Sequence, residues 1–158
     1  MMGFFEEIAI GEEHRLGSHA FTKEAIIAFA RQYDPQRFHV DEEAAKDSLL
    51  GGLCASGWHT AAAAMRVIVE ARTLGLAERA AQGLPLPPLG VSPGFEKLRW
   101  PTPTRPGDVV TYFSRILDKR ETKRPHWGLV TMRTWGVNQR GLEALTMENR
   151  AYIGRRGG

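Results

Sequence analysis

Residues 33–41, YDPQRFHVD, place a carboxylate, Asp34, and an imidazole, His39, five residues apart. A carboxylate and an imidazole that hold one water molecule between them can take a proton from that water and deliver a proton to a nearby carbon. Pro35 disfavours helical dihedral angles at Asp34, so we expect a helix to end there and an irregular stretch to lead to His39. A structural alternative stays open, with Asp34 as a turn residue and His39 as a buried histidine bonded to a carbonyl group.

A second candidate group lies at Gly57, within GGLCASGWHTAAAAMRVIVEARTLG (residues 51–75). Ser56 is a suitable N-cap for a helix of about 16 residues over 57–72, with Gly75 as its stop. Small and apolar residues on most sides, Met65 among them, predict a helix that is buried nearly all round. The N-terminus of a buried helix offers N–H donors and a positive dipole end, which suit a developing oxyanion. At Gly57 the missing side chain would let a bulky ligand approach the backbone closely.

The remaining elements must position these groups. Thr22 caps a helix predicted over 23–33, and Asp41 caps a short helix that begins at Glu42. Alternating β-branched and aromatic residues predict strands over the ranges 13–21, 95–100, 108–119, 127–137 and 142–153. Helices followed by consecutive strands indicate one α+β domain, residues 1–158, with an antiparallel sheet. A long helix against a curved sheet favours hotdog geometry, although other α+β arrangements fit the same pattern.

Composition excludes several classes of protein. The chain has 158 residues, a net charge of +3 and one cysteine, so an internal disulfide is impossible. Lysines and arginines are interspersed with acids, which argues against a nucleic-acid-binding surface. Neither a signal peptide nor a membrane-spanning run is evident, so we expect a cytoplasmic protein with no membrane partner. His39 and His59 lack the spacing of metal ligands, so we expect no metal, and we expect His59 to be a satisfied core residue.

Three segments together resemble the MaoC-like dehydratase family, which includes (R)-specific enoyl-CoA hydratases. They are DPQRFHVDEEAAK (34–46), GGLCASGWHTAA (51–62) and SPGFEKLRWPTPTRPGDVV (92–110). The resemblance implies a hotdog fold, a coenzyme A thioester as substrate with no other cofactor, and a homodimer or a dimer of dimers. Gln36 and Arg37 replace the family's Asn and Pro, and Ser56 replaces the histidine before the family's glycine.

The resemblance and the chemistry together assign the candidate site. Asp34 is expected as the base toward water, His39 as its partner in holding the water and delivering the proton, and Gly57 as the oxyanion donor. Expected substrate contacts are Ser56, which could orient substrate or water, and Trp58 in the acyl pocket. Guanidinium groups suit the phosphates of coenzyme A, and the candidates are Arg37 and Arg99, with Lys97 and Arg105 beside them. The proline-rich segment 84–93 is expected to be a loop that could cover an acyl tunnel.

The predicted function is therefore hydration of an enoyl thioester or the reverse dehydration. Two other functions stay open. A hotdog thioesterase would use a carboxylate and a helix amide too, but it would release a free thiol. A non-catalytic acyl-CoA-binding module is the second alternative, because this chain departs from the family pattern at Gln36, Arg37 and Ser56.

Overall fold

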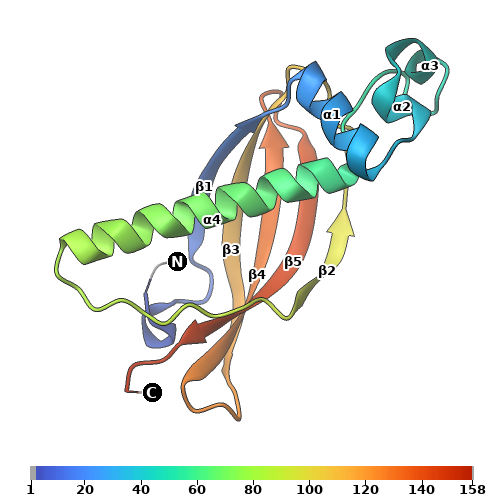
Figure 1. The fold of residues 1–158 in the computed structure, drawn as a ribbon. Helices are drawn as coiled ribbons and strands as arrows, with labels where there is room; N and C mark the ends of the chain where they lie inside the picture. Colours follow the sequence, from blue (N-terminus) through green and yellow to red (C-terminus); the bar gives the residue numbers. More distant parts are fainter. Residues whose placement is uncertain (1–2, 158) are drawn as a thin grey trace.

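The computed structural model describes residues 3–157, which form one curved antiparallel sheet with a long helix across one of its faces. The elements are η1 (Phe5–Glu7), β1 (Glu13–Ala20), α1 (Lys23–Tyr33), α2 (Arg37–Val40), α3 (Glu42–Lys46), α4 (Gly57–Ala81), β2 (Gly94–Arg99), β3 (Val109–Glu121), β4 (Trp127–Asn138) and β5 (Glu143–Gly154). The strands run in the order β1-β3-β4-β5-β2, and α4 crosses the face of the curved sheet while α1 to α3 gather beyond its N-terminal end (Figure 1). This arrangement confirms the α+β hotdog prediction.

The small residues of α4 explain how closely it lies on the sheet. Ala63, Ala64 and Val67 are buried against a cluster that includes Tyr112 and Leu145 from β3 and β5. Helix side chains that end at Cβ let the helix axis approach the strands and fill the interior without voids. The Tyr112 hydroxyl donates a 3.1 Å hydrogen bond to the carbonyl of residue 60 in α4, so the helix is held in register on β3.

The predicted length of α4 was wrong. The helix has 25 residues, passes through Gly75 and ends at the C-cap Gln82, where Gly83 takes a positive φ of 69°. A glycine inside a helix costs only about 1 kcal/mol, and the strong helix formers that follow Gly75 outweigh it. Among residues 3–157, even this longest helix lacks the apolarity of a membrane span, as do the others.

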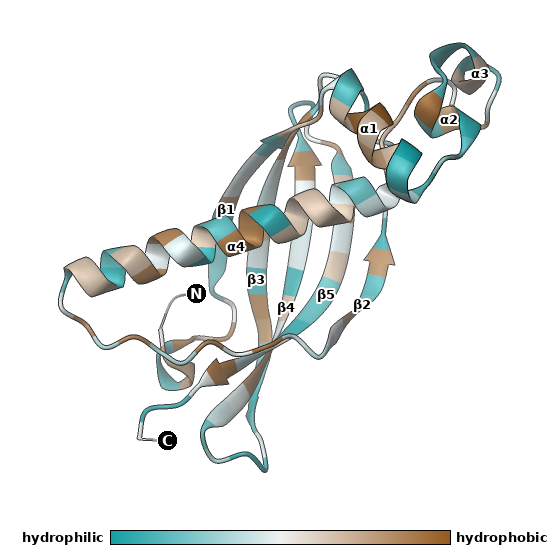
Figure 2. Ribbon diagram, viewed as in Figure 1, coloured by the Kyte–Doolittle hydropathy of each residue, from teal (hydrophilic) through white to brown (hydrophobic). Residues whose placement is uncertain are grey.

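Nearly complete burial of α4 was also wrong. The helix is buried on one face only, and Met65, expected in the core, is 50% exposed. Figure 2 shows polar and apolar residues alternating along its turns, and the C-terminal half extends past the β1 edge of the sheet. A helix that overhangs its sheet has no second surface to cover its outer face, so polar residues are required there.

Segments 22–47 follow the predicted caps with one difference. The Thr22 side chain caps α1 through the Ala25 N–H, and Asp41 caps α3 through the N–H groups of residues 43 and 44. The stretch after Pro35 is not wholly irregular, because Arg37–Val40 forms a single helical turn. That turn shortens the path from Asp34 to His39.

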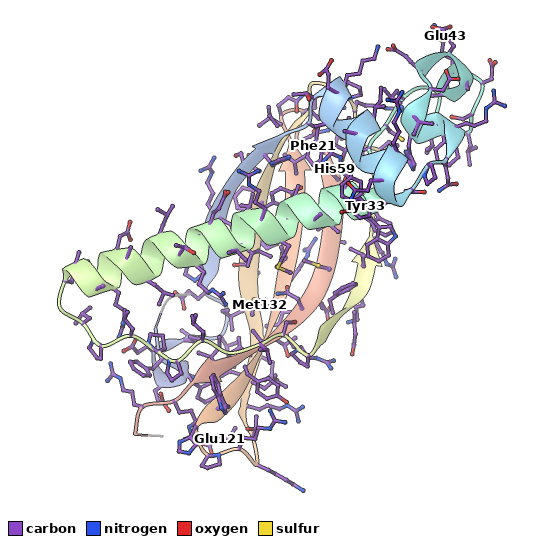
Figure 3. The ribbon with its side chains drawn as sticks, viewed as in Figure 1. Phe21, Tyr33, Glu43, His59, Glu121 and Met132 are labelled. Atoms are coloured by element: carbon purple, nitrogen blue, oxygen red, sulfur yellow. The ribbon has the colours of Figure 1, made fainter. Side chains whose placement is uncertain are left out.

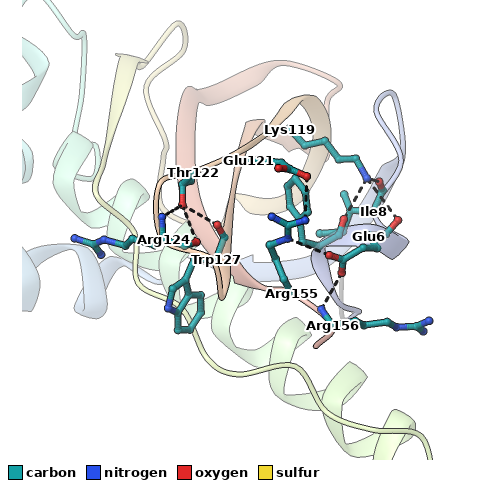
Figure 4. Close-up of polar contacts among 10 residues, drawn as sticks. Glu6, Ile8, Lys119, Glu121, Thr122, Arg124, Trp127, Arg155 and Arg156 are labelled. Carbon is teal, nitrogen blue, oxygen red and sulfur yellow. Dashed lines mark hydrogen bonds and ion pairs between the residues drawn. The ribbon is translucent and has the colours of Figure 1, made fainter. Parts of the chain in front are cut away.

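Polar contacts hold the N-terminal segment against the end of the sheet that lies away from α1–α3 (Figure 4). Lys119 Nζ donates to the carbonyls of Phe5 and Ile8 at 3.2 and 2.7 Å, and Arg155 bridges Glu6 and Glu121. These contacts join η1 to β3 and to the residue that follows β5. Lys119 belongs to the basic cluster 118–124, so this lysine serves the fold rather than a nucleic-acid surface.

Candidate active site

Local structure brings Asp34 and His39 together. The backbone N–H of Asp34 closes α1 on the carbonyl of Ala30, and the single turn of α2 then returns the chain toward it. Asp34 Oδ2 lies 3.5 Å from His39 Nε2, and the two side chains are 19% and 7% exposed. The predicted convergence of this acid and this imidazole is therefore present in the structure.

The orientation of His39 is fixed by its other nitrogen. Nδ1 lies 2.8 Å from the carbonyl oxygen of Cys54, which can only accept, so Nδ1 carries a proton and donates it. When the ring is neutral, Nε2 then presents a lone pair toward Asp34. Burial raises the pKa of the Cys54 thiol, which lies 3.6 Å from Nδ1, so this thiol stays protonated and is a poor nucleophile.

The Asp34 carboxylate is held on both oxygens. Ser56 Oγ donates to Oδ2 at 2.7 Å, and Gln36 Nε2 donates to Oδ1 at 2.8 Å. Partial burial raises the pKa of the carboxyl group, but the hydrogen bonds from Ser56 and Gln36, with a smaller effect of His39 whenever its ring is protonated, hold the pKa below its ordinary value. Asp34 is therefore ionised at neutral pH.

Gly57 begins α4 beside this pair. The Ser56 side chain caps the helix by accepting the Trp58 N–H at 3.2 Å, as the sequence predicted. Within residues 3–157, nothing accepts the N–H of Gly57. An unpaired N–H at the positive end of a helix can stabilise a negative oxygen.

A cavity of about 130 Å³ opens beside His39 and Gly57, while Asp34 lies behind His39 and does not line it. Its walls include His39, Gly57, Thr60, Trp100, Thr104 and Ala144. Trp100 packs directly on Gly57, because a Cβ added to that glycine would fall 2.6 Å from Trp100 Cε2. The glycine is thus required by the indole ring as well as by any approaching ligand.

The other predicted substrate contacts lie outside this cavity. Trp58 is 53% exposed and meets Trp100 edge-on at 5.7 Å, while Arg37 and Arg99 are exposed on α2 and β2. Ser56 is buried, with its hydroxyl already bonded to Asp34 and to the backbone.

Arg105 is engaged in the fold rather than free for a phosphate. Its guanidinium donates to the carbonyls of Leu50, Gly52 and Leu53, the segment that leads to Cys54 and Ser56. These contacts favour a structural role for Arg105 over the expected contact with coenzyme A.

His59 is buried at the start of α4, near Phe21 and β1 (Figure 3). Its ring stacks on Phe29 at 4.5 Å, but within the described residues its Nδ1 has no hydrogen-bond partner, so the expectation of a satisfied group was wrong. Burial, with a smaller effect of His19, lowers its pKa to about 4.

Sequence reasoning missed Gln36, Trp100 and the Cys54 carbonyl. Gln36 lies two residues after Asp34, a spacing at which an amide can reach back, so that signal was present. Trp100 and Cys54 carry no such signal, because their contacts depend on packing between distant segments. No cluster of three or more metal-ligating side chains is found in residues 3–157.

Comparison with known proteins shows the family of the chain. The family model described as MaoC like domain matches residues 6–136, most of the chain. The chain belongs to the MaoC-like domain family. The crystal structure of the MaoC-like dehydratase from Rhodospirillum rubrum is 38% identical to it, with a TM-score of 0.81 over 98% of this chain and 99% of that chain.

Two further proteins are similar to this chain. The uncharacterized Bacillus subtilis protein YdeM is 27% identical over 150 residues, which are 95% of this chain and 98% of that protein. The (R)-hydratase PhaJ1 from Pseudomonas aeruginosa is 19% identical with a TM-score of 0.68, covering 97% of this chain and 86% of the other. At 19% identity, the comparison with this hydratase shows a shared fold. Membership of the family rests on the family model and on the 38% identical dehydratase structure.

Proposed function

We propose that this MaoC-like protein is a hydratase or dehydratase that acts on a 2-enoyl thioester of coenzyme A or of an acyl carrier. The observation that carries the proposal is the 3.5 Å approach of Asp34 Oδ2 to His39 Nε2 beside the unpaired N–H of Gly57. An ionised carboxylate and a neutral imidazole present two acceptors to each other. A water molecule that donates one hydrogen to each satisfies both and is held for attack.

In the hydration direction, the oxygen of this water forms a bond to the β-carbon of the enoyl group, and one of its protons passes to Asp34. The electrons of the double bond move onto the thioester oxygen, and the Gly57 N–H and the helix dipole stabilise the resulting enolate. Asp34 then passes this proton to His39 Nε2, and His39 delivers it to the α-carbon. The product is a 3-hydroxyacyl thioester, and Asp34 and His39 return to their starting states.

The test is a spectrophotometric assay of crotonyl-CoA hydration. We expect turnover by the wild type and a loss of at least about 100-fold in Asp34→Asn and His39→Ala, because each removes a proton-transfer group. Asp41→Asn and His126→Ala are matched controls, since Asp41 caps α3 and His126 is exposed. Absence of turnover by the wild type on any enoyl thioester contradicts the proposal.

The same assay separates the alternative functions. A thiol-reactive dye reports the free coenzyme A that a thioesterase would release, whereas hydration changes only the enoyl absorbance. Tight binding of the thioester with neither signal would identify a non-catalytic binding module.

We propose in addition that Arg37 and Arg99 contact the phosphates of coenzyme A outside the cavity, with Trp58 beside them. Both guanidinium groups are exposed, and Arg99 directly precedes Trp100 in the sequence. The double variant Arg37→Ala/Arg99→Ala should raise KM for a coenzyme A thioester and leave kcat nearly unchanged. An unchanged KM contradicts this assignment.

We propose a homodimer that pairs at the β2 edge. In the described residues β2 pairs only with β5, and exposed apolar side chains lie on and before it, including Leu89, Val91 and Phe95. An edge strand with exposed apolar residues favours association. Light scattering should give a dimer for the wild type and a monomer for Phe95→Glu, with Leu142→Glu, on the turn between β4 and β5, as the control. A monomeric wild type contradicts the proposal.

A further inference from the structure

The cavity beside His39 and Gly57 is small for an acyl chain. An apolar cavity of about 150 Å³ holds benzene, which has six carbon atoms. By that measure, the volume of about 130 Å³ holds roughly five non-hydrogen atoms of a chain. A 2-enoyl group whose carbonyl reaches Gly57 would fill it at four or five carbons.

Two buried hydroxyl groups line the cavity, those of Thr60 and Thr104. Thr60 and Thr104 are 2% and 3% exposed, and their hydroxyls lie 3.3 Å apart. Thr60 is further fixed because its carbonyl accepts the hydrogen bond from Tyr112. A longer chain would have to displace this pair and leave buried polar atoms without partners, which is costly.

The Trp100 ring forms another wall of the cavity. It lies on Gly57 and is 40% exposed, so it borders both the cavity and solvent. Pro101 and Pro103 restrict the backbone after it. The Thr104 carbonyl accepts the N–H of Ala55 at 2.8 Å, which fastens this segment to the residues before α4. The indole is therefore carried by a constrained backbone, and its ring is the most exposed of the side chains that line the cavity.

Building on the hydratase function proposed above, we propose that Trp100 sets the upper limit of acyl length, so that the protein acts on 2-enoyl thioesters of four or five carbons. The Thr60–Thr104 pair lines one part of the cavity wall, and Trp100 lines another. Removing the indole opens a path from the cavity toward the outside, along which a longer chain can extend.

The experiment compares kcat/KM for 2-enoyl-CoA substrates of four, six and eight carbons. In the wild type we expect the eight-carbon value to lie at least about 30-fold below the four-carbon value, since even a single methylene in a hydrophobic pocket is worth about 10- to 200-fold. Trp100→Ala should raise the eight-carbon value at least about 10-fold while the four-carbon value falls only a few-fold. Met65→Ala, which shortens an exposed side chain of α4 outside the cavity, should leave the ratio unchanged. A wild type indifferent to length, or a ratio unaffected in Trp100→Ala, overturns the proposal.

Binding separates this proposal from the proposed function. Saturated butyryl-CoA and octanoyl-CoA cannot be hydrated, so calorimetry with these ligands tests the pocket whether or not the protein is a hydratase. The wild type should bind butyryl-CoA more tightly than octanoyl-CoA, and Trp100→Ala should reduce or reverse the difference. Equal binding of the two by the wild type overturns the length limit even if crotonyl-CoA is hydrated.

A second pair of variants tests the contact between Trp100 and Gly57. Gly57→Ala forces the indole to move, so we expect hydration to fall at least about 10-fold. Gly57→Ala/Trp100→Ala should regain part of that loss, because the clash is gone. Equal activity of the single and double variants, with both shown to be folded by thermal melting, would mean that the indole does not rest on the glycine.

Discussion

Ser56 Oγ donates a 2.7 Å hydrogen bond to Asp34 Oδ2, the same oxygen that faces His39. The residue that caps α4 therefore also orients the carboxylate at the end of α1. One hydroxyl accepts a backbone N–H from the helix and donates to the acid, so the start of the helix and the candidate base are positioned by a single side chain.

Ser56→Ala should separate these two roles. Loss of the cap costs about 1 kcal/mol of unfolding free energy. Loss of the donor should raise the pKa of Asp34 and lower kcat/KM by roughly 10- to 100-fold, the range for groups that orient a reacting residue. Chemical denaturation and the hydration assay measure the two effects. Thr22→Ala, which removes the cap of α1, is the control and should lose stability alone; equal activity in both variants would contradict the role of Ser56.

Gln36 should tune the same carboxylate from its other oxygen. Removing the amide in Gln36→Ala takes away a hydrogen bond that favours the ionised form, so the pKa of Asp34 should rise. The acidic limb of the kcat/KM profile then moves to higher pH, and carboxyl-carbon NMR follows the titration directly. Gln32→Ala, on the exposed surface of α1, should leave both measurements unchanged. A profile that does not move in Gln36→Ala would show that the amide has no influence on the acid.

Acid should destabilise the fold through His59. Its pKa is lowered by burial from 6.5 to about 4, so the unfolded chain binds the proton more tightly than the folded one. The stability it contributes is complete above pH 6.5 and is lost as the pH falls from there to about 4, by roughly 3 kcal/mol. Urea denaturation at several pH values measures this slope. His59→Phe should flatten the slope while the ring still stacks on Phe29, and His126→Gln should not; an equally steep slope in His59→Phe would contradict the assignment.

Arg105 should stabilise the segment before α4. Its guanidinium bonds three backbone carbonyls, so Arg105→Ala leaves them unsatisfied and should cost about 2–4 kcal/mol. The loosened segment carries the Cys54 carbonyl, so kcat should fall as well. Thermal melting and steady-state kinetics test this, with exposed Arg120 on β3 as the control position. A raised KM with unchanged stability would instead indicate that Arg105 binds a phosphate.

The strands were accessible from the sequence because alternation and turn residues are local signals. The predicted range 127–137 compares with β4 at Trp127–Asn138, and 108–119 compares with β3 at Val109–Glu121. The length of α4 was not accessible, because Gly75 is a stop signal only where the following residues do not favour helix. Gly83, with its positive φ, is the actual stop.

The candidate site likewise contains some contacts that the sequence could predict and others that it could not. Asp34 and His39 are five residues apart, so a single turn can bring them together and the pattern alone suggests the pair. Ser56 lies 22 residues from Asp34, and its cap function was predicted while its bond to the acid was not. Trp100 directly follows β2, which lies at the edge of the sheet beside β5 and not beside β3, the next strand in the sequence. Its contact with Gly57 depends on this packing, which produces no periodic pattern in the sequence.

The candidate reacting groups all come from residues 34–57, whereas the Trp100 ring and one of the two cavity hydroxyls, that of Thr104, come from residues 100–104. Under the two proposals above, the position that limits acyl length is therefore encoded apart from the groups that react. A duplicated copy of the gene could then acquire a new acyl preference by a substitution in codon 100, with its proton-transfer groups inherited intact.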